Sequence, residues 1–234
     1  MTEIWSYLAQ QPLLWLTATL AAFLIGMALF RAAGQSPFAN PSLIAMGLLA
    51  VLLAVTGTPF ATYFEGAQFV HFLLGPATVC LALPLYDNLP KVRQAALPLL
   101  AALLVGAVTG IVAVLAIGKA FGLAPAILAS MAPKSATAAV AIGVSEQLGG
   151  SPTLTAMMVM MTGLTGAMVA TPLLNLLGIR DWRARGFAVG VAAHGFGTAR
   201  AFQVHPTAGA FAGLGMGLNA MMTAILAPIL LRLF

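Results

Sequence analysis

Four ionisable side chains lie inside long apolar stretches of this sequence: Lys134, Glu146, His194 and Arg200. A charged group in an apolar surrounding is costly, so each needs a partner or a function. Their neighbours indicate that the function is binding a small anion or carrying a proton.

Lys134 follows Pro133, a residue that favours the first turn of a helix, and is followed by Ser135 and Thr137. A helix N-terminus carries partial positive charge, so a lysine there is unfavourable unless an anion lies beside it. Backbone N–H groups, a lysine and two hydroxyls make a receptor for a carboxylate or phosphate. We expect a substrate site here; the alternative is that Lys134 reaches the membrane surface or pairs with an acid.

A second candidate site surrounds Gly195 and Gly197, with His194, Thr198 and Arg200 beside them. Each glycine destabilises a helix by about 1 kcal/mol relative to alanine. Irregular backbone at membrane depth occurs only where it is buried in protein or lines a cavity. The pattern predicts a helix break whose N–H groups face a cavity, where Arg200 binds a carboxylate and His194 binds substrate or titrates. A histidine that merely packs in the interior is the alternative.

Three further features are weaker candidates. Glu146, near the glycine-rich end of the Lys134 segment, and His194 are the expected carriers of a coupling proton; a surface position is the alternative for Glu146. Gly209, Gly213 and Gly217 share one helix face and predict close helix packing. Asn219, beside them, is a candidate ligand of the substrate.

Catalytic motifs are absent from the sequence. Ser135 or Ser145 with His194 would be the only nucleophile–base pair, and no recognisable spacing supports it. Cys80 is the only cysteine, and no metal-binding or phosphate-loop pattern occurs. We expect no catalytic residue, no metal and no cofactor, and hence no enzyme.

The composition identifies the setting of these residues. Hydrophobic residues make up 61% of the 234 residues and charged residues 6%, with mean hydropathy +1.03. A soluble domain has about 25% charged residues, so the chain is expected to be an all-α integral membrane protein in one transmembrane domain, residues 1–234. The net charge of +5 is then an orienting signal and does not indicate nucleic acid.

About eight hydrophobic segments are expected, at 11–30, 41–57, 67–86, 95–118, 124–148, 152–178, 186–204 and 208–233. Interruptions are expected around Pro76, Pro133 and Gly195–Gly197. Residues 64–110 align without a gap on 121–167, with an interrupted segment in each copy. Such pairs of interrupted segments are typical of transporter binding sites, and they suggest an inverted repeat.

The basic residues between segments bear on the topology. If all segments cross, the loop with Lys91 and Arg93 lies opposite the polar loop 180–185, against the positive-inside tendency. A re-entrant segment 124–148 would remove the conflict. It would place the N-terminus outside and loop 180–185 in the cytoplasm.

Five motifs carry a resemblance to a known family: APKS (132–135), AIGVSEQLGG (141–150), ARGFA (184–188), AHGFGTARA (193–201) and GAFAGLGMGLN (209–219). The chain resembles the LrgB/CidB family, whose relatives include the plant plastidal glycolate/glycerate translocator. Members often carry an acidic residue after the fourth motif; here Gln203 to Pro206 follows, with His205 as the titratable group.

Two functions follow from the residues and the resemblance together. The first is secondary transport of small monocarboxylates of the glycolate, glycerate or pyruvate class, with proton coupling and alternating access. The second is an antiholin-like regulator of murein hydrolase activity and lysis, without carrier activity. For either we expect a multi-pass protein of the bacterial inner (cytoplasmic) membrane, a homodimer, and a small holin-like membrane protein as partner.

Overall fold

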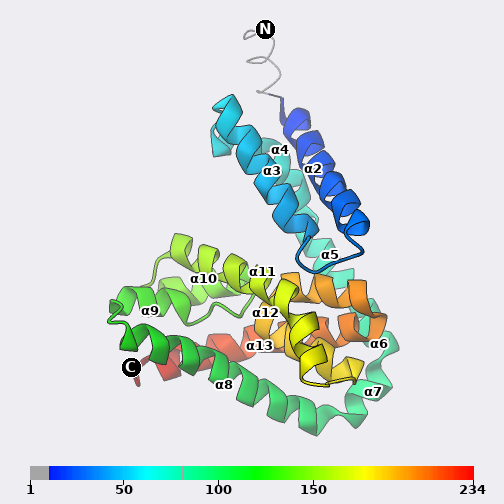
Figure 1. The fold of residues 1–234 in the computed structure, drawn as a ribbon. Helices are drawn as coiled ribbons and strands as arrows, with labels where there is room; N and C mark the ends of the chain where they lie inside the picture. Colours follow the sequence, from blue (N-terminus) through cyan, green and yellow to red (C-terminus); the bar gives the residue numbers. More distant parts are fainter. Residues whose placement is uncertain (1–10, 81) are drawn as a thin grey trace. The chain divides into compact units, whose positions relative to one another are not determined.

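The computed structural model describes residues 11–80 and 82–234, which contain helices and no strand (Figure 1). The chain divides into two compact units, Met1–Cys80 and Leu81–Phe234. The first contains α2 (Pro12–Ala32), α3 (Pro41–Thr56), α4 (Phe60–Phe72) and α5 (Leu74–Cys80). The second contains α6 (Ala82–Asp87), α7 (Leu89–Gln94), α8 (Ala96–Ala120), α9 (Pro125–Met131), α10 (Ala138–Gln147), α11 (Pro152–Leu176), α12 (Trp182–Val204) and α13 (Pro206–Leu231).

The long helices confirm an all-α, multi-pass membrane protein. Among the described residues, four helices of 21 to 26 residues are apolar and long enough to cross a bilayer: α2, α8, α11 and α13. About 20 residues suffice for a hydrocarbon layer of about 30 Å. Leu97, Val105 and Ile117 of α8 are exposed, as lipid-facing side chains would be. The single domain and the repeat of 64–110 on 121–167 stay predictions, since the first copy crosses the division between the units.

Proline and a capping side chain set the start of two helices. Asn40 and Ser151 each accept a hydrogen bond from a first-turn N–H, and Pro41 and Pro152 occupy the first helical positions. Proline costs nothing there because the first N–H groups of a helix have no partner within the helix.

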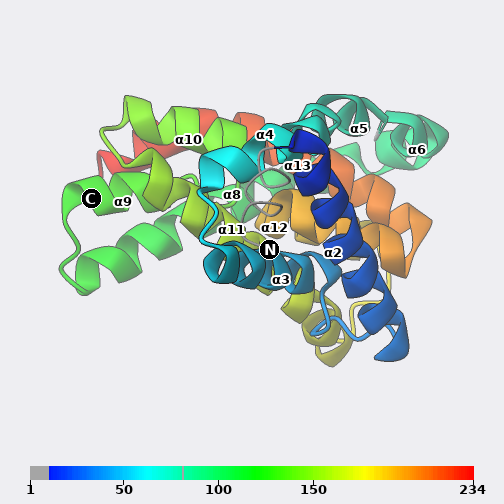
Figure 2. The ribbon, with the colours of Figure 1, turned by 90° about the horizontal axis from the view of Figure 1, so that it is seen from above.

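In the first unit, α2, α3 and α4 lie side by side in both views (Figures 1 and 2). Ala22, Ala45 and Leu49 form their small apolar core, and Trp15 meets Tyr63 edge to face. The predicted interruption of segment 67–86 is present, but the helix breaks at Leu73, before Gly75–Pro76. Pro76 lies in the first turn of α5, where proline is tolerated.

Segment 124–148 is broken into two short helices. α9 has 7 residues and α10 has 10, and residues 132–137 join them in a turn. At about 1.5 Å per residue neither helix approaches the thickness of a bilayer. We call α9, the turn and α10 the hairpin.

The two ends of the hairpin lie at the same end of the bundle. Leu128 of α9 packs on Gly118, near the C-terminal end of α8. Val144 of α10 joins Ala227, near the C-terminal end of α13, in one buried cluster. These ends of α8 and α13 lie close together: the Lys119 Nζ, near the end of α8, donates to the main-chain carbonyl of Phe234, just beyond α13, at 2.7 Å. The chain therefore enters and leaves the hairpin at one end of the bundle, which is the arrangement that a re-entrant segment requires.

Three buried hydroxyls tie the hairpin to α11. The Thr155 Oγ1 lies 2.7 Å from the Ser145 Oγ of α10 and 3.0 Å from the Ser130 carbonyl of α9. The Ser130 Oγ accepts from the Ser151 N–H at 2.7 Å. Ser130, Ser145 and Thr155 have no exposed surface, so these hydrogen bonds are made without competition from water.

Replacing Thr155 by valine is expected to loosen the hairpin. Thr155→Val keeps the shape but leaves the Ser145 hydroxyl without this partner, which costs about 1–3 kcal/mol for a buried group. Thermal unfolding in detergent should report the loss. Thr165→Val, at an exposed position of the same helix, should change stability by less than about 0.5 kcal/mol. Equal effects would show that the hydroxyls do not hold the hairpin.

α12 is interrupted within the predicted segment 193–200, at the two residues directly before Gly195. The backbone is non-helical at Ala193 and at His194, which has φ 39° and ψ −130°. Gly195 and Gly197 lie inside the helix that follows. A second correction concerns loop 180–185: α12 begins at Trp182, and Asp181 caps it by accepting from the Arg183 N–H.

The close contact of α12 with α13 also differs from the expectation. Gly209 packs under the Phe202 ring and Gly217 has open space beside it. The close approach is instead made by Gly186 and Gly190 of α12, which lie directly on main-chain carbonyl groups of α13. Gly215 of α13 lies in turn on the Phe187 main chain of α12, so glycines of both helices allow the two main chains to approach closely.

Candidate functional site

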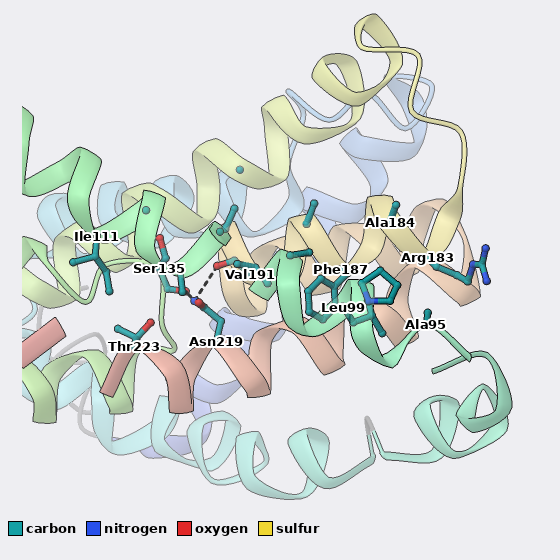
Figure 3. A pocket seen from close by; sticks show the side chains of 18 of the residues that line it. Ala95, Leu99, Ile111, Ser135, Arg183, Ala184, Phe187, Val191, Asn219 and Thr223 are labelled. Carbon is teal, nitrogen blue, oxygen red and sulfur yellow. Dashed lines mark hydrogen bonds between the residues drawn. The ribbon is translucent and has the colours of Figure 1, made fainter. Parts of the chain in front are cut away.

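A cavity of about 870 Å³ lies within the second unit (Figure 3). Its walls come from α8, α11, α12, α13 and the turn of the hairpin. Most lining side chains are small or apolar, and the polar ones are Gln94, Lys134, Ser135, Thr162, Asp181, Arg183, Asn219 and Thr223. A concave, mostly apolar space with a few polar groups is typical of small-molecule sites.

Short side chains on one face of α8 leave room for this cavity. Ala102, Gly106 and Gly110 line it. A Cβ on Gly106 would come within 3.1 Å of the Val191 side chain, and one on Gly110 within 3.8 Å of the Ser135 Oγ. Larger residues at these positions would fill the space between α8 and the hairpin.

Gln94, at the end of α7, and Arg183, in the first turn of α12, line the same cavity. The chain near Lys91 and Arg93 and the chain near Arg180 thus meet at the same cavity. Asp181 and Arg183 form an ion pair of 2.6 Å, which lowers the pKa of the Asp181 carboxyl to about 2. Both side chains are more than 40% exposed, so the pair contributes little to stability.

Lys134 and Ser135 line the cavity near the middle of α8, at the turn of the hairpin. Lys134 does not begin a helix, as had been expected: α10 starts at Ala138, with Thr137 as its N-cap. The Lys134 Nζ lies 3.5 Å from the Ser135 Oγ and makes no ion pair with any residue of the described chain. A positive charge without a counter-charge thus lies at the cavity wall.

Asn219 joins the hairpin to the broken helix, as Figure 3 shows. Its Nδ2 donates to the Ser135 carbonyl at 3.1 Å and to the Val191 carbonyl at 2.9 Å. In a regular helix the Val191 carbonyl would accept from the N–H four residues on. The break at Ala193 and His194 interrupts that pattern, and Asn219 supplies a donor there.

The break itself is buried in protein. The His194 ring is 4% exposed, and its Nε2 lies 2.9 Å from the Val159 carbonyl of α11. Gly163 makes room for the ring, since a Cβ there would overlap it, and Gly166 does the same for Ala193. His194 thus has the interior packing position that was the alternative interpretation.

Several predicted site residues are not brought to the cavity. Gly195, Gly197 and Thr198 do not line it, and the Thr198 hydroxyl donates to the His194 carbonyl at 2.8 Å. Arg200 lies in another small pocket, with Trp182 and Arg185, and its Nη1 donates to Gln203.

Two other predicted residues also lie elsewhere. Thr137 is half-buried as the N-cap of α10 and does not line the cavity. Glu146 is exposed near the end of α10, without an ion pair to Lys134 or Arg200 in the part of the chain described. The structure thus groups Lys134, Ser135 and Asn219, and leaves the other predicted ligands apart.

The sequence reasoning missed part of the cavity wall. Thr162 and Thr223 place hydroxyl-bearing side chains at it from α11 and α13. Polar residues within apolar helices were a signal for them, but nothing in their spacing linked them to Lys134.

Comparison with known proteins agrees with the motifs. Residues 19–233 match the LrgB-like family. The holin-like protein CidB of Staphylococcus epidermidis is 36% identical over 86% of this chain and 87% of its own length. The holin-like protein CidB of Staphylococcus aureus is 37% identical over 85% and 87%.

A Bacillus subtilis relative, the uncharacterized protein YxaC, is 33% identical over 92% of this chain and 94% of its own length. No solved structure matches the chain. The match over nearly the whole length and the similarity to the two staphylococcal proteins show that the chain belongs to the LrgB-like family.

Proposed function

We propose that this protein carries small monocarboxylates, of the glycolate, glycerate or pyruvate class, across the bacterial cytoplasmic membrane. The observation that supports this function is the Lys134 charge at the cavity wall, which has no counter-charge among residues 11–80 and 82–234. Lys134 lies at the turn of the hairpin, beside the middle of α8, a helix long and apolar enough to cross a bilayer. Carriers commonly bind substrate near the midplane, at interrupted helices.

In this proposal the cavity opens toward the end where Gln94 and Arg183 lie, and Lys134 binds the carboxylate. Asn219 links the hairpin to α12, so a movement of the hairpin would also displace the α12 backbone near Ala193 and His194. Alternating access would then move these elements together relative to the rest of the bundle. The coupling proton remains assigned to His194 or Glu146. His194 is the one within the bundle, and Glu146 is exposed.

The second candidate function is an antiholin-like regulator of murein hydrolase activity and lysis. The names of the staphylococcal relatives favour it over the carrier. Such a protein would act through homodimers or with a small holin-like membrane protein. It would require packed helices, such as α12 and α13, and would not require Lys134.

Uptake of labelled glycolate into proteoliposomes, with and without a pH gradient, tests the two functions. A carrier should give saturable uptake that the gradient accelerates, while an unrelated solute such as sucrose stays out. Uptake that does not saturate, with equal leakage of sucrose, would support a holin-like pore. Absence of both would support a regulator without transport.

A further inference from the structure

The side-chain oxygen of Asn219 is a buried acceptor with no hydrogen bond. Asn219 lines the cavity and is 1% exposed. Its two hydrogen bonds go to main-chain carbonyls, which only the amide NH₂ can donate to, so the orientation of the amide is fixed. The Oδ1 has no partner among residues 11–80 and 82–234. Nearly all buried polar atoms in proteins have one, so this atom indicates a donor that comes from outside the chain.

The surroundings of this oxygen restrict the donor. Ser135 lies between the two groups, since its carbonyl accepts from Asn219 and its hydroxyl lies 3.5 Å from the Lys134 Nζ. Ser135 is thus flanked by a cation, Lys134, and by the residue that carries the unpaired acceptor, Asn219. A ligand ammonium would add a second positive charge near Lys134, whereas a hydroxyl would not.

Two further hydroxyl-bearing side chains line the same cavity. Thr162 and Thr223 line it, and their hydroxyls make no hydrogen bond with another residue of the described chain. Thr223 is one helical turn beyond Asn219 on α13. A ligand with several polar groups could form hydrogen bonds with these hydroxyls, whereas an acid with only a hydrocarbon tail would leave the hydroxyls without a partner.

We propose that Asn219 determines specificity: its Oδ1 accepts a hydrogen bond from a hydroxyl next to the carboxylate that Lys134 binds. This inference rests on the proposed carrier function and narrows it to 2-hydroxy monocarboxylates. A keto acid presents an acceptor at the same place and an unsubstituted acid presents nothing. Both the keto acid and the unsubstituted acid would leave the Asn219 oxygen without a hydrogen bond. A site built to form a hydrogen bond with its ligand binds analogues that cannot form that bond much more weakly.

Competition against labelled glycolate in proteoliposomes tests the requirement for a donor without changing the protein. Unlabelled glycolate and lactate should compete roughly tenfold or more better than acetate, methoxyacetate, propionate and pyruvate. Methoxyacetate is the critical probe, because it keeps the oxygen of glycolate but cannot donate. Equal competition by methoxyacetate, or strong competition by glycine, would overturn the assignment.

Two asparagine substitutions test whether Asn219 causes the preference for glycolate over acetate. Asn219→Ala should reduce the preference for glycolate over acetate about tenfold, toward equal competition. Asn175→Ala, at an exposed asparagine near the end of α11, should keep it. A preserved preference in Asn219→Ala would overturn the proposal. If that variant does not remain folded in detergent, the ligand series on the unchanged protein still decides.

The outcomes separate this inference from the function on which it rests. Saturable glycolate uptake without preference for a hydroxyl would refute only the role of Asn219. Absence of saturable uptake of any of these acids would refute the carrier function and the inference together.

Discussion

Lys134→Ala is expected to lower glycolate uptake about 100-fold or more at substrate concentrations below saturation. The substitution removes the cation at the cavity wall that has no counter-charge within the described chain. Charge-assisted hydrogen bonds are about twice as strong as neutral ones, and a factor of 100 corresponds to about 2.8 kcal/mol. Initial rates in proteoliposomes would measure the effect. Lys134→Arg should retain part of the uptake because it retains the charge.

Two controls make this result specific. Lys91→Ala removes an exposed lysine whose Nζ bonds Asn88, and it should leave uptake unchanged. Arg200→Ala tests the sequence-based expectation directly: Arg200 does not line the cavity, so uptake should fall far less than with Lys134→Ala. Equal loss with Arg200→Ala, or normal uptake with Lys134→Ala, would contradict the assignment of the anion site.

Gly190→Ala is expected to destabilise the protein, as is Gly186→Ala, which places a Cβ against α13 in the same way. The Cβ added to Gly190 would overlap the main-chain carbonyl oxygen of Ala212 in α13. A carbonyl within a helix cannot turn aside as a side chain can, so the two helices must separate. Overpacking typically costs about 1–3 kcal/mol, and here it exceeds the gain in helix propensity of about 1 kcal/mol. The change in the free energy of unfolding, measured in detergent, would test this.

Gly217→Ala is the matched control, because Gly217 is in α13 and has open space at the position of a Cβ. It should be neutral or stabilise the protein by up to about 1 kcal/mol. Similar destabilisation by both substitutions would show that contact with the α13 backbone is not what Gly190 provides. Normal stability of Gly190→Ala would mean that α12 and α13 are less closely packed than the structure indicates.

The amino-acid sequence alone determined the class of the protein and several interruptions of its helices. Too few charges to cover a soluble surface leave only a membrane protein. Pro133 predicted the broken segment, and the distribution of basic residues predicted that the segment is re-entrant. These features are local or compositional, and they depend on backbone chemistry and on the cost of charge in lipid.

The exact place of the break in α12 was decided by tertiary packing. Glycine propensity favoured Gly195 and Gly197, but the backbone departs from the helix at Ala193 and His194. A positive φ at a residue other than glycine costs about 1–3 kcal/mol. At His194 that cost is offset by a buried ring packed on Gly163 and bonded to the Val159 carbonyl. None of these contacts can be read from local sequence.

Which residues form the candidate site was likewise decided only by the tertiary structure. Lys134 was evident as a lysine in an apolar segment, but Asn219, which bonds the carbonyl of the neighbouring Ser135, is 84 residues away from Ser135 in the sequence. Arg200 seemed the better ligand because of its charge, yet it does not line the cavity that Lys134 does. Composition and residue chemistry showed that this chain must hold polar groups within a membrane. Which of those groups meet depends on the fold of the hairpin against α13, a long-range contact that no local pattern specifies.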